Sequence, residues 1–258
     1  MSEPTAALAK LLGASSIDDH DEVLKAANAA IKASKGADLN AQHTRIVALL
    51  KLDRFDDALR AIADAGSALE SKISLEKAYA LYKTGQHDEA GKVLKAADAG
   101  SPIQSRASRH LSAQIAYRAE RFEDAAQLYG ALETDHDEVV DEENDIKINR
   151  LATHAQLEWQ GRGAEVLDES QRQPAREDLE AFETAFNSAC GCIARGDLSK
   201  AAVLLKRASD LCGASEDLTD EEKKAELLPI TVQHAYVLSQ LGKESEAAAL
   251  QKSIELTE

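Results

Sequence analysis

Small and large apolar residues recur along the chain at offsets that repeat from one segment to the next. Five alanines mark the pattern: intervals of 32 and 35 residues separate the first three, and intervals of 76 and 46 residues follow. The interval of 76 residues has room for two units. A large side chain comes three residues before most of these alanines, and another small residue comes twelve before most of them. The five alanines are Ala58, Ala90, Ala125, Ala201 and Ala247.

This spacing predicts repeated pairs of antiparallel helices. Two helices cross closely only where both present small side chains, and large residues three or four positions away form the stripe that the next pair covers. Gly85, Gly196 and Gly242 stand five residues before three of the alanines, where the chain must turn, and Asp53 and Glu120 take that place in two other units. A period near ~34 residues with this pattern is typical of the tetratricopeptide repeat, whose units stack into a superhelix.

We therefore predict an all-α fold, a tetratricopeptide-repeat α-α superhelix of about seven helix hairpins that forms a single domain over residues 1–258. Residues 5–31 make the first hairpin, with Val23, Ala27 and Ala30 at the core positions of its second helix. Residues 143–170 make a degenerate fifth hairpin, with a long first helix and a short, poor second one. Two acidic stretches, 133–145 and 216–226, fall where the unit spacing is longer, so we expect solvated insertions between helices at both.

Composition agrees with helices and restricts the classes of partner. Only 4% of the residues are aromatic, and 13 Gly and 4 Pro are too few for the turns of an all-β protein. The chain carries 30 basic and 46 acidic residues, a net charge of −16, which opposes binding to nucleic acids and to anionic membrane surfaces. No apolar stretch approaches the ~20 residues of a membrane helix, and the N-terminus does not resemble a signal peptide. These features predict a soluble, intracellular protein.

Residues that could carry out catalysis or bind a metal are scattered. Cys190 and Cys192 lie on a predicted helix with their side chains about 200° apart, and Cys192 falls on a core position. The three cysteines are too few and too unevenly placed to make a disulfide framework. The chain contains no P-loop, no nucleotide-binding glycine motif and no nucleophile elbow. We therefore expect no enzymatic activity, no cofactor and no metal.

In a superhelix of helix hairpins, the first helix of each unit lines the concave surface. The repeat register places four of the five tyrosines there, including Tyr236, where they form a recognition surface or pack against the next unit. In three units a basic residue lies near the end of the same first helix, where it interacts favourably with the helix macrodipole or binds an acidic group of a ligand. The predicted peptide-binding residues of this concave groove are Val47, Leu50, Lys51, Tyr79, Tyr82, Lys83, Gln114, Tyr117, Arg118, Asn149, Phe186 and Asn187.

Five longer strings are more specific than the general repeat pattern. They resemble the family of 72-kilodalton tetratricopeptide subunits of the eukaryotic signal recognition particle, in order from about residue 41 to residue 256. The resemblance implies that the chain is the N-terminal part of a longer protein. The strings are Leu75–Tyr79, Ala116–Phe122, Phe186–Cys190, Leu204–Cys212 and Gln233–Gly242.

The resemblance also implies partners and a location. In this family the repeat array binds the 68-kilodalton subunit of the particle through a linear segment, and a basic region beyond the repeats contacts the particle's RNA. Nothing in this sequence matches that basic region, so RNA contact is expected only outside this chain. The family is cytoplasmic, associates with ribosomes and the endoplasmic reticulum in protein targeting, and does not insert into the membrane.

A second function class remains open from the sequence, a chaperone-docking tetratricopeptide adaptor that recognises a C-terminal carboxylate. Its clamp needs Lys and Asn at set places on three consecutive first helices. Asn187 stands at one such place, but Thr44, Glu76 and Leu111 stand at its counterparts.

Overall fold

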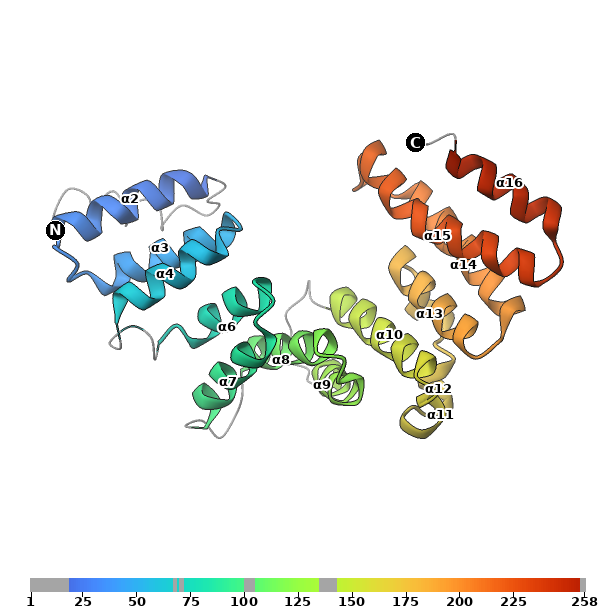
Figure 1. The fold of residues 1–258 in the computed structure, drawn as a ribbon, viewed down its shortest axis with the longest axis horizontal. Coiled ribbons are helices and arrows are strands. Elements are labelled where there is room, and N and C mark those ends of the chain that lie inside the picture. The colour runs from blue at the N-terminus through green and yellow to red at the C-terminus, as the bar shows by residue number, and fades with distance from the viewer. Residues whose placement is uncertain (1–18, 67–68, 70–71, 100–104, 135–142, 256–258) are drawn as a thin grey trace. The chain divides into compact units, whose positions relative to one another are not determined.

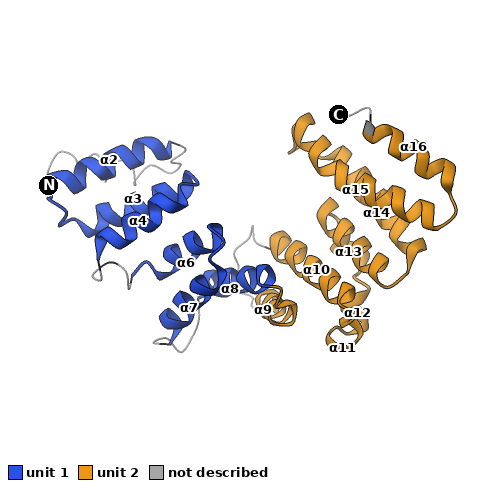
Figure 2. Ribbon diagram, viewed as in Figure 1, with its two compact units in different colours: residues 1–119 blue, residues 120–258 orange. Residues whose placement is uncertain are grey.

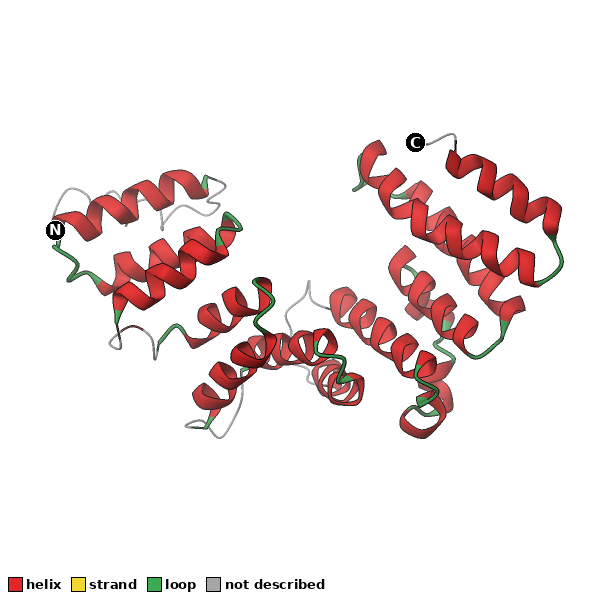
Figure 3. Cartoon of the chain, in the orientation of Figure 1, coloured by secondary structure: helices red, strands yellow, loops and turns green. Residues whose placement is uncertain are grey.

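The structure is a computed structural model that describes all residues except 1–18, 67–68, 70–71, 100–104, 135–142 and 256–258. The described residues form helices joined by turns, and no strand occurs among them (Figure 3). The predicted all-α fold is therefore confirmed. None of the helices in this part of the chain is long and apolar enough to cross a membrane.

The chain divides into two compact units, residues 1–119 and residues 120–258 (Figure 2). Each helix of the first unit packs against the next one along the chain. The predicted single domain over both units stays a prediction. The helices of the first unit are α2 (His20–Ala33), α3 (Leu39–Lys51), α4 (Phe55–Ala65), α6 (Ser74–Lys83), α7 (His87–Asp98) and α8 (Arg106–Arg118) (Figure 1).

In the second unit, α10 packs against α9 and α13, and α13, α14, α15 and α16 follow one another in contact. The first helices of its hairpins are α10, α13 and α15; in the first unit they are α3, α6 and α8. The elements of the second unit are α9 (Phe122–Thr134), α10 (Glu143–Trp159), α11 (Gly163–Val166), α12 (Glu169–Arg172), the 3-10 turn η1 (Arg176–Leu179), α13 (Phe182–Ala194), α14 (Leu198–Ala214), α15 (Asp220–Gln240) and α16 (Glu244–Glu255).

The repeating alanines occupy the helix crossings, as the spacing predicts. Each of the five alanines that mark the repeat is buried, and so is each small residue twelve positions earlier. Tyr129 and Leu205, four residues after two of these alanines, are also almost fully buried. Val23, Ala27 and Ala30 of α2 are buried as well, whereas residues 5–18 of the predicted first hairpin lie outside the described residues. Close helix contact explains the small side chains, because a larger one would force the helices apart.

The turns between paired helices share one backbone conformation. Gly85, Gly196 and Gly242 have φ of +80°, +80° and +74°, and Asp53 and Glu120 adopt the same left-handed region at φ 54° and 58°. Only glycine enters this region without a steric penalty from Cβ. The turn is therefore imposed by the hairpin geometry, and two units accept strain to make it.

We expect Glu120→Gly to raise the free energy of unfolding by about 1 kcal/mol, because it relieves the left-handed strain at an exposed position. Urea denaturation followed by circular dichroism measures the change. Glu120→Ala is the matched control, since it removes the same charge and keeps Cβ. Equal stabilisation by both substitutions would contradict the strain argument.

The fifth hairpin is degenerate, as predicted. After α10 the chain forms only the short helices α11 and α12 and the turn η1 before α13 begins. The prediction for residues 133–145 falls largely on 135–142, outside the described residues. The prediction of an insertion at 216–226 is wrong from Asp220 onward, because α15 begins there. Thr219 and Glu222 form a capping box, and three acidic residues in the first turn favour the helix N-terminus.

Candidate functional site

The basic residues predicted for the binding surface end three first helices of the first unit. Lys51, Lys83 and Arg118 are the last residues of α3, α6 and α8, and all three are exposed. A cation at this position interacts favourably with the helix macrodipole. Each therefore has a structural role within its own helix and also leaves its charged end in solvent, where an acidic ligand can reach it.

An aromatic cluster lies where α6 packs against the preceding hairpin. The ring of Tyr79 is edge-on to Phe55 of α4, with centroids 6.1 Å apart. Tyr82 lies 6.5 Å from Tyr79 and 5.8 Å from the imidazole of His87. Lys83 places Nζ 5.3 Å from the centre of the Phe55 ring, within cation-π range. Both tyrosines pack against the core and stay half-buried, so part of each ring still faces solvent.

The faces of α3 and α6 are joined by a polar contact beside two predicted site residues. His43 Nε2 lies 2.7 Å from Glu76 Oε1, within hydrogen-bonding distance. Val47, one turn along α3 from His43, is exposed, while Leu50 is half-buried against the core of the first unit. On α8, Gln114 is half-buried, as is Tyr117. The predicted residues of the first unit thus share partly exposed positions on consecutive first helices.

In the second unit, the predicted asparagines bond to backbone. Asn187 of α13 donates from Nδ2 to the carbonyl oxygen of Ile148 at 3.1 Å, which ties α13 to α10. Asn149 donates to the carbonyl oxygen of Asp145, one turn earlier on α10, at 2.8 Å. Phe186 is half-buried and packs against the core. The Asn187 bond joins α13 to α10, whereas the Asn149 bond lies within α10, and only part of each side chain is exposed.

Sequence reasoning missed an exposed apolar stripe on α15. Leu228, Val232 and Tyr236 follow at intervals of four residues and are 48%, 47% and 49% exposed. The opposite side of α15 is also apolar, with Ile230, Val237 and other residues buried against the second unit. The register identified Tyr236 alone. The sequence did carry a signal for this stripe, namely apolar residues at every fourth position from Leu228. Because α15 has apolar residues on two opposite sides, the hydrophobic pattern did not separate this stripe from the side that faces the core.

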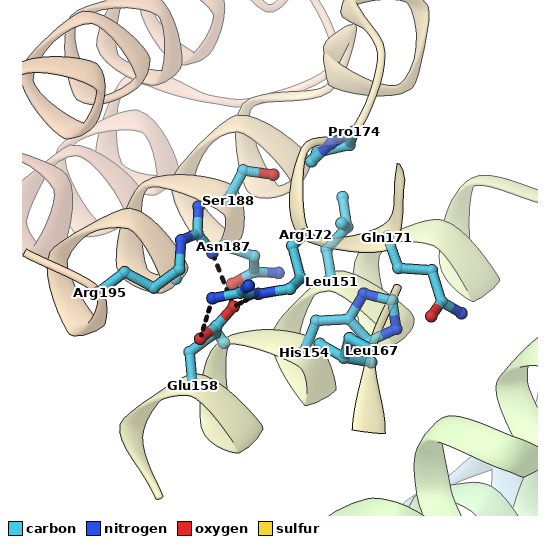
Figure 4. Close-up of a pocket in the computed structure, with 12 residues that line it drawn as sticks. Leu151, His154, Glu158, Leu167, Gln171, Arg172, Pro174, Asn187, Ser188 and Arg195 are labelled. Carbon is cyan, nitrogen blue, oxygen red and sulfur yellow. Dashed lines mark hydrogen bonds and ion pairs between the residues drawn. The ribbon is translucent and has the colours of Figure 1, made fainter. Parts of the chain in front are cut away.

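A buried ion-pair network lies between α10, α12 and α13. The Glu158 carboxylate is buried and accepts hydrogen bonds from Arg172 at 2.7 and 3.3 Å and from Arg195 at 3.0 Å (Figure 4). Burial acts to raise the pKa of Glu158, but the hydrogen bonds from the two guanidinium groups outweigh it and lower the pKa below its usual range. The carboxylate is therefore ionised and paired at neutral pH, which suits a structural role.

The surroundings of Glu158 leave no room for a substrate. The adjoining cavity has a volume of about 10 Å³, enough for about one water molecule. Gly163 packs directly against the Glu158 carboxylate, because a Cβ at position 163 would overlap it. Burial and the nearby charge of Arg150 lower the pKa of His154 to about 4, so its ring is neutral at pH 7. At neutral pH the Glu158 carboxylate is thus ionised and paired with two arginines, while the His154 ring is uncharged.

The cysteines are in a hydrophobic setting. Cys192 and Cys212 are buried and Cys190 is half-buried, and all three are free thiols. Burial and the neighbouring Cys192 raise the pKa of Cys190 to about 11, which keeps the thiol protonated. Among the described residues, no group of three or more His, Cys, Asp or Glu side chains is placed to hold a metal ion.

Comparison with known proteins now identifies the family. Residues 16–156, more than half of the chain, match a family model for signal recognition particle repeats described as "Putative TPR-like repeat". The chain belongs to this TPR-like repeat family. The match agrees with the helix hairpins and buried alanines of residues 20–156.

Relatives of this TPR-like chain include subunits of a known particle. It is 30% identical over 241 residues to the signal recognition particle subunit SRP72 of Canis lupus familiaris and, equally, to SRP72 of Homo sapiens. Both matches cover 92% of this chain and 34% of the relative, so the chain spans about a third of the length of these proteins. SRP72 of Schistosoma mansoni is 34% identical over 213 residues, covering 79% of the chain and 27% of the relative.

A solved structure supports the fold. The apo form of the quorum sensor NprR from B. thuringiensis aligns with a TM-score of 0.60 over 98% of this chain and 86% of its own. Identity between the two is 14%, so the likeness concerns the fold alone. Together with the family match, it places the chain among all-α superhelical repeat proteins.

Proposed function

We propose that this chain is the repeat region of a 72-kilodalton signal recognition particle subunit, a protein-binding scaffold that holds the 68-kilodalton subunit of the same particle. The observation that carries the proposal is the similarity to SRP72 over 92% of the chain. The family match supports the scaffold role, because stacked repeats present an extended surface to a partner. The scaffold acts in protein targeting to the endoplasmic reticulum, as part of a cytoplasmic ribonucleoprotein that associates with ribosomes.

The partner segment is proposed to lie along the first helices. Partly exposed apolar or aromatic side chains lie on these helices in both units, at Val47, Tyr79, Tyr82, Val232 and Tyr236. Large apolar side chains that stay accessible are typical of recognition surfaces, and tyrosine contributes area at low entropic cost. A linear segment would place its own apolar side chains against them. Lys51, Lys83 and Arg118 would meet acidic groups at the edge of this surface.

Two features argue against other activities. The titratable groups around Glu158 are paired or neutral, and the cavity beside them is too small for a substrate, which supports a non-enzymatic scaffold. A carboxylate clamp of the chaperone-docking kind is disfavoured at Asn187, which bonds to the backbone of Ile148. Leu111 is buried and Glu76 is acidic, so neither supplies the cation that such a clamp needs.

Titration with the C-terminal region of the 68-kilodalton subunit tests the proposal. We expect saturable binding by calorimetry and protection of first-helix amides from hydrogen exchange. The particle RNA serves as the contrasting ligand: with a net charge of −16, this chain should not bind it tightly at physiological salt. Absence of binding to the protein segment, or submicromolar RNA binding that weakens steeply with salt, would contradict the proposal.

A further inference from the structure

A second surface lies on α14, which is a second helix and is separate from the first-helix surface proposed above. A groove of about 620 Å³ runs between the segment that precedes α13 and one side of α14. Arg176 and Leu179 border it from that segment, and Val203, Lys206, Arg207 and Asp210 border it from α14. We call it the Val203 groove. Its volume is in the range of clefts that bind ligands or several side chains of a peptide.

The apolar part of the groove is left over from the packing of α14. Ala201, Leu204, Leu205 and Ala208 are buried in the core that α14 forms with α13 and α15. Val203 points away from that core and is 69% exposed, the largest exposure of any large hydrophobic side chain among the described residues. An apolar side chain left in water in this way favours binding of a partner that covers it, because covering it removes apolar surface from water.

The charge of the groove is opposite to that of the chain. Three cations, Arg176, Lys206 and Arg207, border it together with one carboxylate, Asp210, which pairs with Lys206 at 3.1 Å. The chain as a whole carries a net charge of −16. Arg207 is held in place because its Nε donates to the carbonyl oxygen of Leu179 at 2.8 Å. The Nη groups of this fixed guanidinium carry additional N–H donors, which can form hydrogen bonds to a carboxylate of a ligand.

We propose that the Val203 groove docks an acidic, apolar-containing segment of a partner protein. Charge complementarity selects the occupant, because a basic rim in an acidic protein attracts carboxylates and repels cationic chains. The apolar side chains of the segment cover Val203 and the stem of Lys206, and its carboxylates meet Arg176 and Arg207. This docking is independent of the first-helix surface, so one chain can hold two segments at once.

Fluorescence anisotropy with a labelled peptide of repeated Asp-Leu-Glu sequence tests the proposal on the full chain. We expect Val203→Glu and Arg176→Glu each to weaken binding by about tenfold or more. Val203→Glu places a carboxylate where the apolar side chains of the peptide dock, and Arg176→Glu replaces a cation at the edge of the groove with an anion. Both positions are exposed, so the fold is retained. Lys224→Glu on α15 is the matched control: it changes the net charge as Arg176→Glu does, at an exposed site outside the groove. It should change the affinity by less than about twofold.

Three results would overturn the proposal. The first is equal loss of affinity in Arg176→Glu and Lys224→Glu, which would indicate attraction to overall charge. The second is loss of binding in Val232→Asp but not in Val203→Glu, which would place the peptide on the first helices. The third is a dimer that Val203→Glu converts to a monomer in light scattering, which would make the groove a contact between copies of this chain. Titration with the 68-kilodalton segment should be unchanged in Val203→Glu, so failure here leaves the proposed function intact.

Discussion

Replacing Glu158 with alanine is expected to lower the free energy of unfolding by about 3–5 kcal/mol. The substitution removes the carboxylate that pairs Arg172 of α12 with Arg195, the residue that follows α13, and leaves two partly buried guanidinium groups without it. Urea denaturation followed by circular dichroism measures the loss. Glu165→Ala on α11 is the control, because that carboxylate is exposed and its removal should change stability by no more than about 0.5 kcal/mol. Similar losses in both variants would show that the network does not stabilise the fold.

Measuring the stability of wild type and of Glu158→Ala as a function of pH gives a second test of the network. The pKa of Glu158 is lower in the folded chain than in the unfolded one, so its contribution is fully present above the unfolded value, about 4.3, and disappears as the pH falls through the lower folded value. The stability difference between wild type and Glu158→Ala should therefore shrink in acid. Other carboxylates contribute equally to both proteins and cancel in the difference. A difference that stays constant down to pH 3 would contradict the ionised pairing.

Replacing Tyr82 with alanine is expected to weaken binding of the 68-kilodalton segment by about 2 kcal/mol, or about thirtyfold. A linear segment loses chain entropy on binding, so a few aromatic contacts must provide most of the affinity. Tyr82 also contacts Tyr79 and His87, so thermal unfolding must be measured in parallel to separate lost binding from lost structure. Calorimetric titration of the folded variant gives the affinity.

Two further variants make this result interpretable. Lys92 is an exposed residue of α7, the second helix of the same hairpin, and it forms an ion pair with Glu89 one turn earlier. The Lys92→Ala variant should therefore bind the 68-kilodalton segment with normal affinity. Val232→Asp changes an exposed residue of α15 without disturbing the core, and it should weaken binding if the segment also reaches the second unit. Normal affinity in both Tyr82→Ala and Val232→Asp, with loss in Lys92→Ala, would place the partner on the second helices.

Several errors and omissions of the sequence reasoning share one cause, competition between overlapping local signals. Residues 216–226 suggested an insertion because acidic residues are abundant there, yet Thr219 and Glu222 are the capping pair of α15. The stripe from Leu228 to Tyr236 was missed because α15 is apolar on opposite sides. In the first case the acidic composition concealed a helix start, and in the second the hydrophobic pattern did not distinguish the side facing the core from the side facing solvent.

The sequence by itself determined the helix hairpins, the buried alanines at their crossings and the turn positions. These features depend on residues near each other in the chain, and a repeated local pattern is visible without the fold. Only the tertiary structure decided what happens between distant residues. Glu158 meets Arg195 across 37 positions, and Leu179 fixes Arg207 across 28, because packing of α10, α13 and α14 brings them together. A helix pattern shows which residues share a face, but which faces stay uncovered, as at Val203, depends on where the neighbouring helices pack.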